Sequence, residues 1–101
     1  ISDGTKGLVI IDISDLNNLS YISRVDTPDF ARFAILDKNE TKAFVADSKA
    51  NLQIIDISDI NAPKIINSID TPYRTYSLAL NQNETMALLA TGSNGLEIVN
   101  L

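Results

Sequence analysis

Hydrophobic and polar residues follow one another in short blocks along the whole chain. Short apolar runs are separated by clusters of Asp, Asn, Ser, Gly and Pro, residue types that favour tight turns. No stretch keeps the helical period of about 3.6 residues over helical length. The pattern therefore predicts short β-strands joined by turns.

The blocks recur at an interval of 44 residues without insertion or deletion. Residues 8–15 read LVIIDISD and residues 52–59 read LQIIDISD. The Asp-Thr-Pro sequence at 26–28 and the Asn-Glu-Thr sequence at 39–41 return at 70–72 and 83–85, and a third copy begins at Gly95. The chain is thus about 2.3 copies of one unit, which predicts a repeat architecture.

The sequence of each complete unit predicts four strands. In the second copy they cover 31–37, 42–46, 52–57 and 64–69, with turns at 37–40, 47–51 and 59–63. The third strand is rich in β-branched Ile and apolar on both faces, as expected of a sheet that packs between two others. Small residues mark the strand expected at a crowded ring axis, namely Ala31, Ala34 and Ala79.

Four antiparallel strands on this period are typical of a β-propeller blade, so we expect an all-β fold. A leucine-rich repeat is the main competing fold, but it needs a period of roughly 20–29 residues. We divide the chain into the end of one blade (1–30), a complete blade (31–70) and the start of the next (71–101).

About 2.3 blades do not close a ring, because propellers typically have 4–8 blades. Two explanations are open. The remaining blades belong to a longer chain, which we favour, or several copies self-associate to close one ring.

The repeated third strand resembles the Leu-Val-Ile-Val-Asp signature of LVIVD repeats. The residues that carry this resemblance are 8–12 (LVIID), 52–56 (LQIID) and 96–100 (LEIVN), followed by Ile-Ser-Asp and later by Asp-Thr-Pro. Leu19 departs from an expected Pro and Asn100 from an expected Asp. The resemblance implies a β-propeller, an extracytoplasmic location at the cell surface or in the periplasm, and a binding or scaffold role without catalytic residues.

Composition excludes several classes of function. The chain has no His and no Cys, so a Ser-His-Asp triad, His- or Cys-ligated metals and disulfides are excluded. With 13 acidic and 8 basic residues, a net charge of −5 and no basic cluster, it is unsuited to nucleic acid. The longest aliphatic run, 8–11, is far shorter than the roughly 20 residues of a membrane-spanning helix. We expect no cofactor.

The two copies differ most directly after the Asp-Thr-Pro sequence. The first copy reads DFARF at 29–33 and the second reads YRTYS at 73–77. In propellers this link joins the outer strand of one blade to the inner strand of the next, on the face where ligands commonly bind. We predict that its aromatic and Arg side chains bind a protein, peptide or glycan ligand, because such residues dominate binding hot spots. They are Phe30, Arg32, Tyr73, Arg74 and Tyr76.

Other polar clusters have simpler explanations. The repeated Asp-x-Ser-Asp-x-Asn at 12–17 and 56–61 offers oxygen ligands, but its spacing is not that of a calcium loop. We expect these side chains, and likewise Asp3 and Asp47, to hydrogen-bond turn backbones, and we predict no metal site. The Asn-x-Ser/Thr sequences at 18–20, 39–41 and 83–85 match glycan acceptors, and turn geometry better explains the repeated pair.

The sequence therefore predicts a non-catalytic binding or scaffolding module. Two alternatives belong to other classes. One is a propeller enzyme whose active site is completed by blades outside this sequence. The other is a structural spacer, whose variable aromatic side chains would pack between blades.

Overall fold

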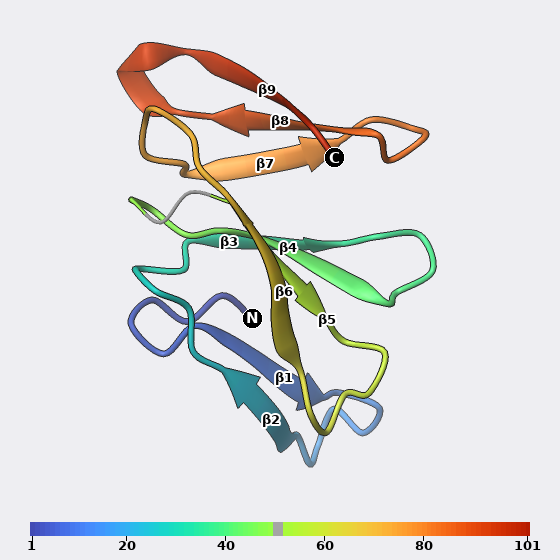
Figure 1. The fold of residues 1–101 in the computed structure, drawn as a ribbon. Coiled ribbons are helices and arrows are strands. Elements are labelled where there is room, and N and C mark those ends of the chain that lie inside the picture. The colour runs from blue at the N-terminus through green and yellow to red at the C-terminus, as the bar shows by residue number, and fades with distance from the viewer. Residues whose placement is uncertain (50–51) are drawn as a thin grey trace.

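The computed structural model describes residues 1–49 and 52–101. The predicted turn at 47–51 is described only as far as Lys49, and its last two residues, 50 and 51, lie outside the described residues. In the described ranges, nine strands form three antiparallel sheets of two, four and three strands, stacked on one another (Figure 1). The strands are β1 (Leu8–Asp12), β2 (Ser20–Val25), β3 (Phe33–Leu36), β4 (Lys42–Ala46), β5 (Leu52–Asp56), β6 (Lys64–Ile69), β7 (Ser77–Leu80), β8 (Met86–Ala90) and β9 (Leu96–Asn100).

The predicted all-β propeller architecture is confirmed, with an unclosed ring of about 2.3 blades. The middle sheet is the complete blade, a meander in the order β3-β4-β5-β6. Strands β4 and β6 have the predicted bounds, whereas β3 begins at Phe33 instead of Ala31. The backbone of Ala31 pairs with Gly4 of the preceding blade instead of with β4, which explains the shorter strand.

The repeat extends to irregular features. The pairing of β1 with β2 shifts register between Ile10 and Ile11, and that of β5 with β6 shifts between Ile54 and Ile55. These positions are 44 residues apart, so the same β-bulge recurs in both blades and bends the outer strand in the same way. The repeated sequence therefore specifies distortions as well as strands.

The Asn-Glu-Thr turns are also built alike. Asp37 accepts hydrogen bonds from the backbone N–H groups of Thr41 (2.8 Å) and Lys42 (3.0 Å). Asn81 accepts the equivalent bonds from Thr85 and Met86. The Glu residue of each turn has a positive φ. These contacts account for the repeated Asn-Glu-Thr sequence by turn geometry.

Two hydrophobic clusters hold the three sheets together. One joins the two-stranded sheet to the middle blade and includes Leu8, Val45 and Ile55. The other joins the middle blade to the three-stranded sheet and includes Leu52 and Leu89. Strand β5 is buried over Leu52–Ile55, as predicted for a sheet covered on both faces. Gln53, on the same strand, is 1% exposed and accepts a hydrogen bond from Ser68 at 2.5 Å.

The three alanines expected at the axis differ in burial. Ala31 is 2% exposed and Ala34 is half-buried, whereas Ala79 is exposed. Ala79 lies in β7 of the last sheet, whose outer side carries no further blade in this structure.

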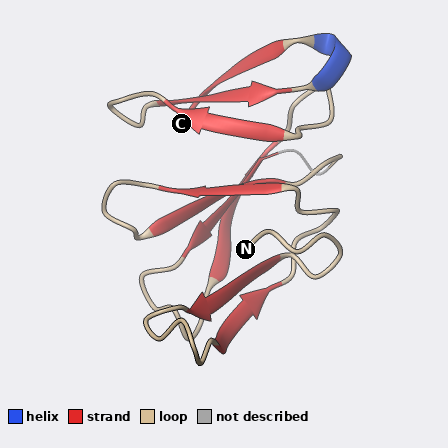
Figure 2. Cartoon of the chain, turned by 180° about the vertical axis from the view of Figure 1, so that it is seen from behind, coloured by secondary structure: helices blue, strands red, loops and turns tan. Residues whose placement is uncertain are grey.

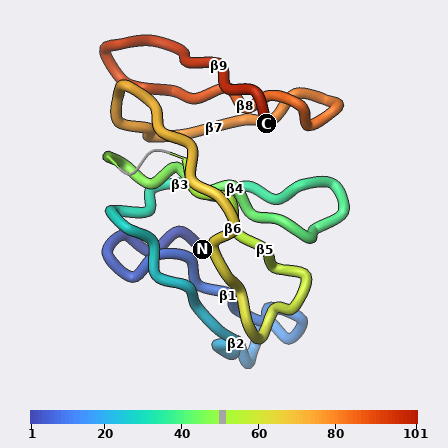
Figure 3. Tube along the Cα trace, in the orientation of Figure 1, coloured from blue at the N-terminus to red at the C-terminus, as the bar shows by residue number. Residues whose placement is uncertain are grey.

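Backbone hydrogen bonds between blades recur with the same spacing. Gly4 pairs with Ala31, and Ser48 pairs with Thr75. Each pair joins the loop before the third strand of one blade to the link that enters the next. Figure 3 shows both links, 26–32 and 70–76, on the same side of the stack.

Because strands alternate in direction, the connections fall on two opposite sides. One side, which we call the variable face, carries residues 3–7, 26–32, 47–49, 70–76 and 91–95. The opposite face carries the turns at 13–19, 37–41, 57–63 and 81–85. A short 3-10 helix, Gly92–Asn94, lies at the β8–β9 connection on the variable face (Figure 2).

Candidate functional site

An arginine stacked between two aromatic rings lies on the variable face. The guanidinium carbon of Arg32 is 5.1 Å from the ring centre of Phe30 and 5.2 Å from that of Tyr76. Both distances are within cation–π range. Phe30 and Arg32 belong to the link before β3, and Tyr76 belongs to the link before β7. The stack therefore crosses from one blade to the next.

A hollow of about 330 Å³ lies beside this stack. Two tyrosine rings and one arginine contribute to its lining together with small polar residues. The lining residues are Pro72, Tyr73, Arg74, Tyr76, Thr91, Gly92, Ser93 and Asn94. The volume is at the lower end of the range of small-molecule sites.

Glycines support both rings of the stack. A Cβ added to Gly4 would lie 2.8 Å from the Phe30 ring, and one added to Gly92 would lie 3.1 Å from the Tyr76 ring. Both glycines have positive φ, the left-handed region that L side chains rarely adopt. They are 88 residues apart, which is twice the repeat length.

A buried carboxyl ties the variable face together in the middle blade. Asp47 is 0% exposed and accepts hydrogen bonds from the Thr27 hydroxyl (2.6 Å) and the Asp29 N–H (3.1 Å). Burial raises the pKa of Asp47 above its usual value, against the lowering effect of these two hydrogen bonds. The prediction that Asp47 hydrogen-bonds a turn backbone is confirmed by its bond from the Asp29 N–H, which belongs to the link 26–32, as does its side-chain partner Thr27.

All five predicted site residues lie exposed on the variable face, but the structure sorts them into two groups. Phe30 and Arg32 belong to the stack, Tyr73 and Arg74 line the hollow, and Tyr76 takes part in both. The sequence prediction missed the residues of the β8–β9 connection that complete the hollow. Alignment of the repeats could have identified these residues, because 91–94 correspond to 47–50, the loop before the third strand.

The repeated Asp-x-Ser-Asp-x-Asn segments form turns closed by their own side chains. Asp12 and Asp56 accept hydrogen bonds from the N–H groups of Ser14 (2.8 Å) and Ser58 (2.9 Å). Hydrogen bonds from these serines hold the pKa of both carboxyls below their usual value. Among the described residues, no group of three or more acidic side chains is arranged to hold a metal ion.

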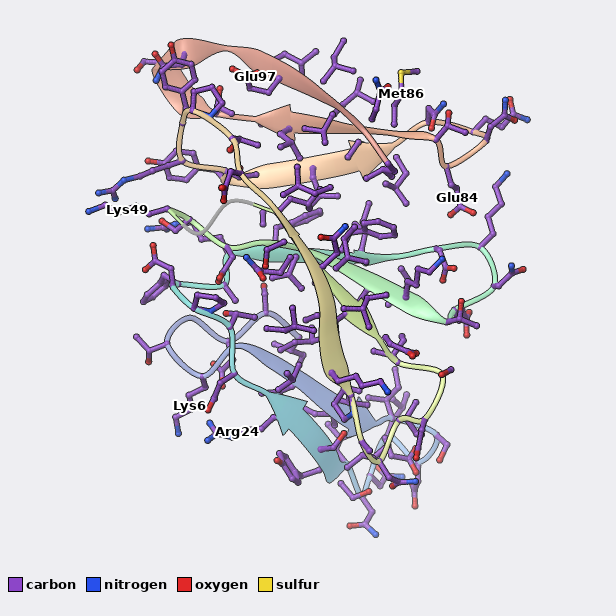
Figure 4. The ribbon with its side chains drawn as sticks, viewed as in Figure 1. Lys6, Arg24, Lys49, Glu84, Met86 and Glu97 are labelled. Atoms are coloured by element: carbon purple, nitrogen blue, oxygen red, sulfur yellow. The ribbon has the colours of Figure 1, made fainter. Side chains whose placement is uncertain are left out.

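Charge is distributed unevenly between the two faces. The turns of the opposite face carry many acidic side chains: Asp15, Asp37, Glu40, Asp59 and Glu84. The variable face carries Lys6, Arg32, Lys49 and Arg74 beside its own Asp residues. Figure 4 shows Lys6 and Lys49 on one side of the three stacked sheets and Glu84 on the other. In the part of the chain that the structure describes, neither Arg32 nor Arg74 forms an ion pair, whereas Arg24 pairs with Asp26 at 3.4 Å.

No helix in the described ranges 1–49 and 52–101 has the length and hydropathy needed to cross a membrane. No curated protein sequence matches the chain. The sequence profile of the LVIVD repeat matches residues 1–27 and 42–71, more than half of the chain. Together with the repeated LVIID and LQIID strands and the blade architecture, this match shows that the chain belongs to the LVIVD-repeat family.

Proposed function

We propose that this chain is a non-catalytic binding module whose ligand occupies the variable face, in a protein located outside the cytoplasm. The observation that carries the proposal is the Arg32 stack beside the hollow lined by Tyr73 and Arg74. It places aromatic and arginine side chains, the residue types that dominate binding hot spots, next to a concave surface.

Exposure supports binding over internal packing for these side chains. Phe30, Tyr73 and Tyr76 are 42%, 42% and 43% exposed. A ring that served only to fill the space between blades would be buried like Leu52 or Leu89, each 0% exposed. The spacer alternative, which requires packed rings, therefore has less support.

The non-catalytic part of the proposal rests on composition, because the chain has no His or Cys to act as base or nucleophile. The location outside the cytoplasm rests on the resemblance of the repeats to those of cell-surface and periplasmic proteins.

An array of glycans and peptides, screened with the full chain, tests the proposal. Tyr76→Ala removes one ring of the stack and one wall of the hollow. Tyr21→Ala is the matched control, because Tyr21 is also exposed and lies on β2, away from the stack. We expect bound probes to be lost with Tyr76→Ala and retained with Tyr21→Ala.

The proposal is wrong if no probe binds, or if binding is indifferent to Tyr76. Chemical conversion of a bound probe would instead favour the enzyme alternative. Thermal melts of both variants separate loss of a contact from loss of the fold.

A further inference from the structure

The stacking of Arg32 leaves a defined part of its guanidinium free. The Phe30 and Tyr76 rings lie at 5.1 and 5.2 Å from its central carbon, so they hold the side chain in place. No described carboxylate lies within ion-pair distance of it. A held guanidinium with unpaired N–H groups matches the two oxygens of a carboxylate.

Arg74 supplies a second guanidinium, in the lining of the hollow, and Tyr76 belongs both to this lining and to the stack. Among the residues that the structure describes, no acidic side chain lines that hollow. Two acidic groups of the variable face have other partners. Asp47 accepts from Thr27 and Asp29, and Asp29 accepts from the Lys49 N–H at 2.8 Å. The hollow therefore favours a negatively charged ligand within a chain of net charge −5.

The remaining lining favours a ligand rich in hydroxyl groups. Ser93 and Asn94 supply hydroxyl and amide groups that both donate and accept hydrogen bonds. The Tyr73 ring supplies a flat face whose negative quadrupole attracts the C–H groups of a sugar ring, whereas the Tyr76 ring is already engaged by Arg32. The described lining contains no Leu, Ile, Val or Met, so it offers little apolar surface for the buried anchor side chain of a peptide.

The geometry points to an acidic glycan as the ligand, with the carboxylates of its uronic acids bound by Arg32 and Arg74 and a sugar ring packed on Tyr73. This inference rests on the proposed function and gives its ligand a chemical class. A glutamate-rich peptide, which shares the carboxylate but not the sugar ring, is the competing ligand that the experiment separates.

The test titrates the full chain with a short oligomer of galacturonic acid, with its methyl ester and with a glutamate-rich peptide, by calorimetry. We expect the acid oligomer to bind and the ester and peptide to bind far more weakly. Arg32→Gln and Arg74→Gln should each weaken binding of the acid oligomer about 10- to 100-fold, and added salt should weaken it further. Arg24→Gln removes the same charge from an arginine already paired with Asp26, so it should leave binding unchanged.

Arg32→Lys is a second variant, because it keeps the charge and loses the planar fork. We expect it to bind more weakly than the wild type. If Arg32→Gln fails to fold, the exposed Arg74→Gln still decides the result. Equal binding of the methyl ester would overturn the carboxylate assignment while leaving the proposed function intact. Binding of the peptide in place of the oligomer, or loss of binding with Arg24→Gln, would overturn it as well. If the array described above also finds no ligand, the proposed function itself fails.

Discussion

We call the loop before the third strand of a blade, together with the link that enters that blade, its corner. The corners of the middle blade (47–49 with 26–32) and of the last sheet (91–95 with 70–76) occupy the same positions in the repeat but differ in side-chain chemistry. In the middle blade, Asp47 ties the β4–β5 loop to the link 26–32 through Thr27 and Asp29. In the next copy the equivalent of Asp47 is Thr91, whose hydroxyl donates to the carbonyl of Gly95 in its own loop at 2.7 Å. The first corner is closed by a buried carboxyl, and the second lacks this tie.

The open corner is also the one that contains the hollow. The position of Asp29 is taken by Tyr73, and the position of Ser48 by Gly92, where an added Cβ would lie 3.1 Å from the Tyr76 ring. The comparison teaches that a few side chains at fixed repeat positions convert a structural corner into a concave surface. The strands and the links between blades do not have to change.

The largest expected effect concerns the loop that ends at Gly7 in the first copy and at Gly95 in the third. A Cβ at Gly7 would lie 2.2 Å from the Val25 carbonyl oxygen, whereas a Cβ at Gly95 would have no atom within 4 Å. Both glycines have positive φ. We expect Gly7→Ala to lower the free energy of unfolding by at least about 3 kcal/mol and Gly95→Ala by about 1–2 kcal/mol. Urea titration of both variants measures the difference, and equal losses would contradict the structural comparison.

A smaller loss of stability is expected when Asp47, whose hydrogen bonds join the β4–β5 loop to the link 26–32, is substituted. Asp47→Ala leaves the Thr27 hydroxyl and the Asp29 N–H without their buried acceptor. It should therefore lower the free energy of unfolding by about 1–3 kcal/mol. Thr91→Val should cost only about 0.5–1 kcal/mol, because the Gly95 carbonyl keeps its bond from the Thr91 N–H at 2.9 Å. Denaturant unfolding is again the measurement. A larger loss with Thr91→Val would mean that both corners are tied equally.

The smallest expected effect is on the pH dependence of stability, to which the carboxyls of Asp47 and Asp37 should contribute with opposite sign. Because burial raises the folded pKa of Asp47, its contribution to stability is full below its unfolded pKa and is lost as pH rises through the folded pKa. The stability of the wild type relative to Asp47→Asn should therefore fall as pH rises from about 3 to 7.

Asp37→Asn provides the opposite case. Burial raises the pKa of Asp37, but the hydrogen bonds from Lys42 and Thr41 outweigh this and hold it below its usual value. The stability of the wild type relative to Asp37→Asn should therefore fall as pH drops through the folded pKa. Unfolding curves across this pH range test both signs, and the same sign for the two variants would contradict the opposite pKa shifts of Asp47 and Asp37.

Contacts close in sequence were predictable, and contacts between blades were not. The bounds of β4 and β6 follow from local turn residues and the 44-residue period. The predicted start of β3 was wrong because Ala31 pairs with Gly4 of the neighbouring blade. The sequence alone did not predict the Arg32 stack for the same reason. Phe30 and Tyr76 come together only through the packing of one blade on the next.

The variable residues were found by comparing copies, but their division into a stack and a hollow required the structure. Asp47 shows the same limit. Its residue type indicates hydrogen bonding to backbone, whereas the choice of Thr27 and Asp29 as partners depends on how the loop folds over the neighbouring link.

The backbone pairs between blades also determine how far local damage spreads. Gly4 pairs with Ala31 and Ser48 with Thr75, so each pair joins a blade to the one that directly follows. An array whose contacts reach only nearest neighbours holds its stability at the junctions as much as within its units. We therefore expect damage at one junction to weaken the two sheets that it joins and to leave more distant sheets unaffected.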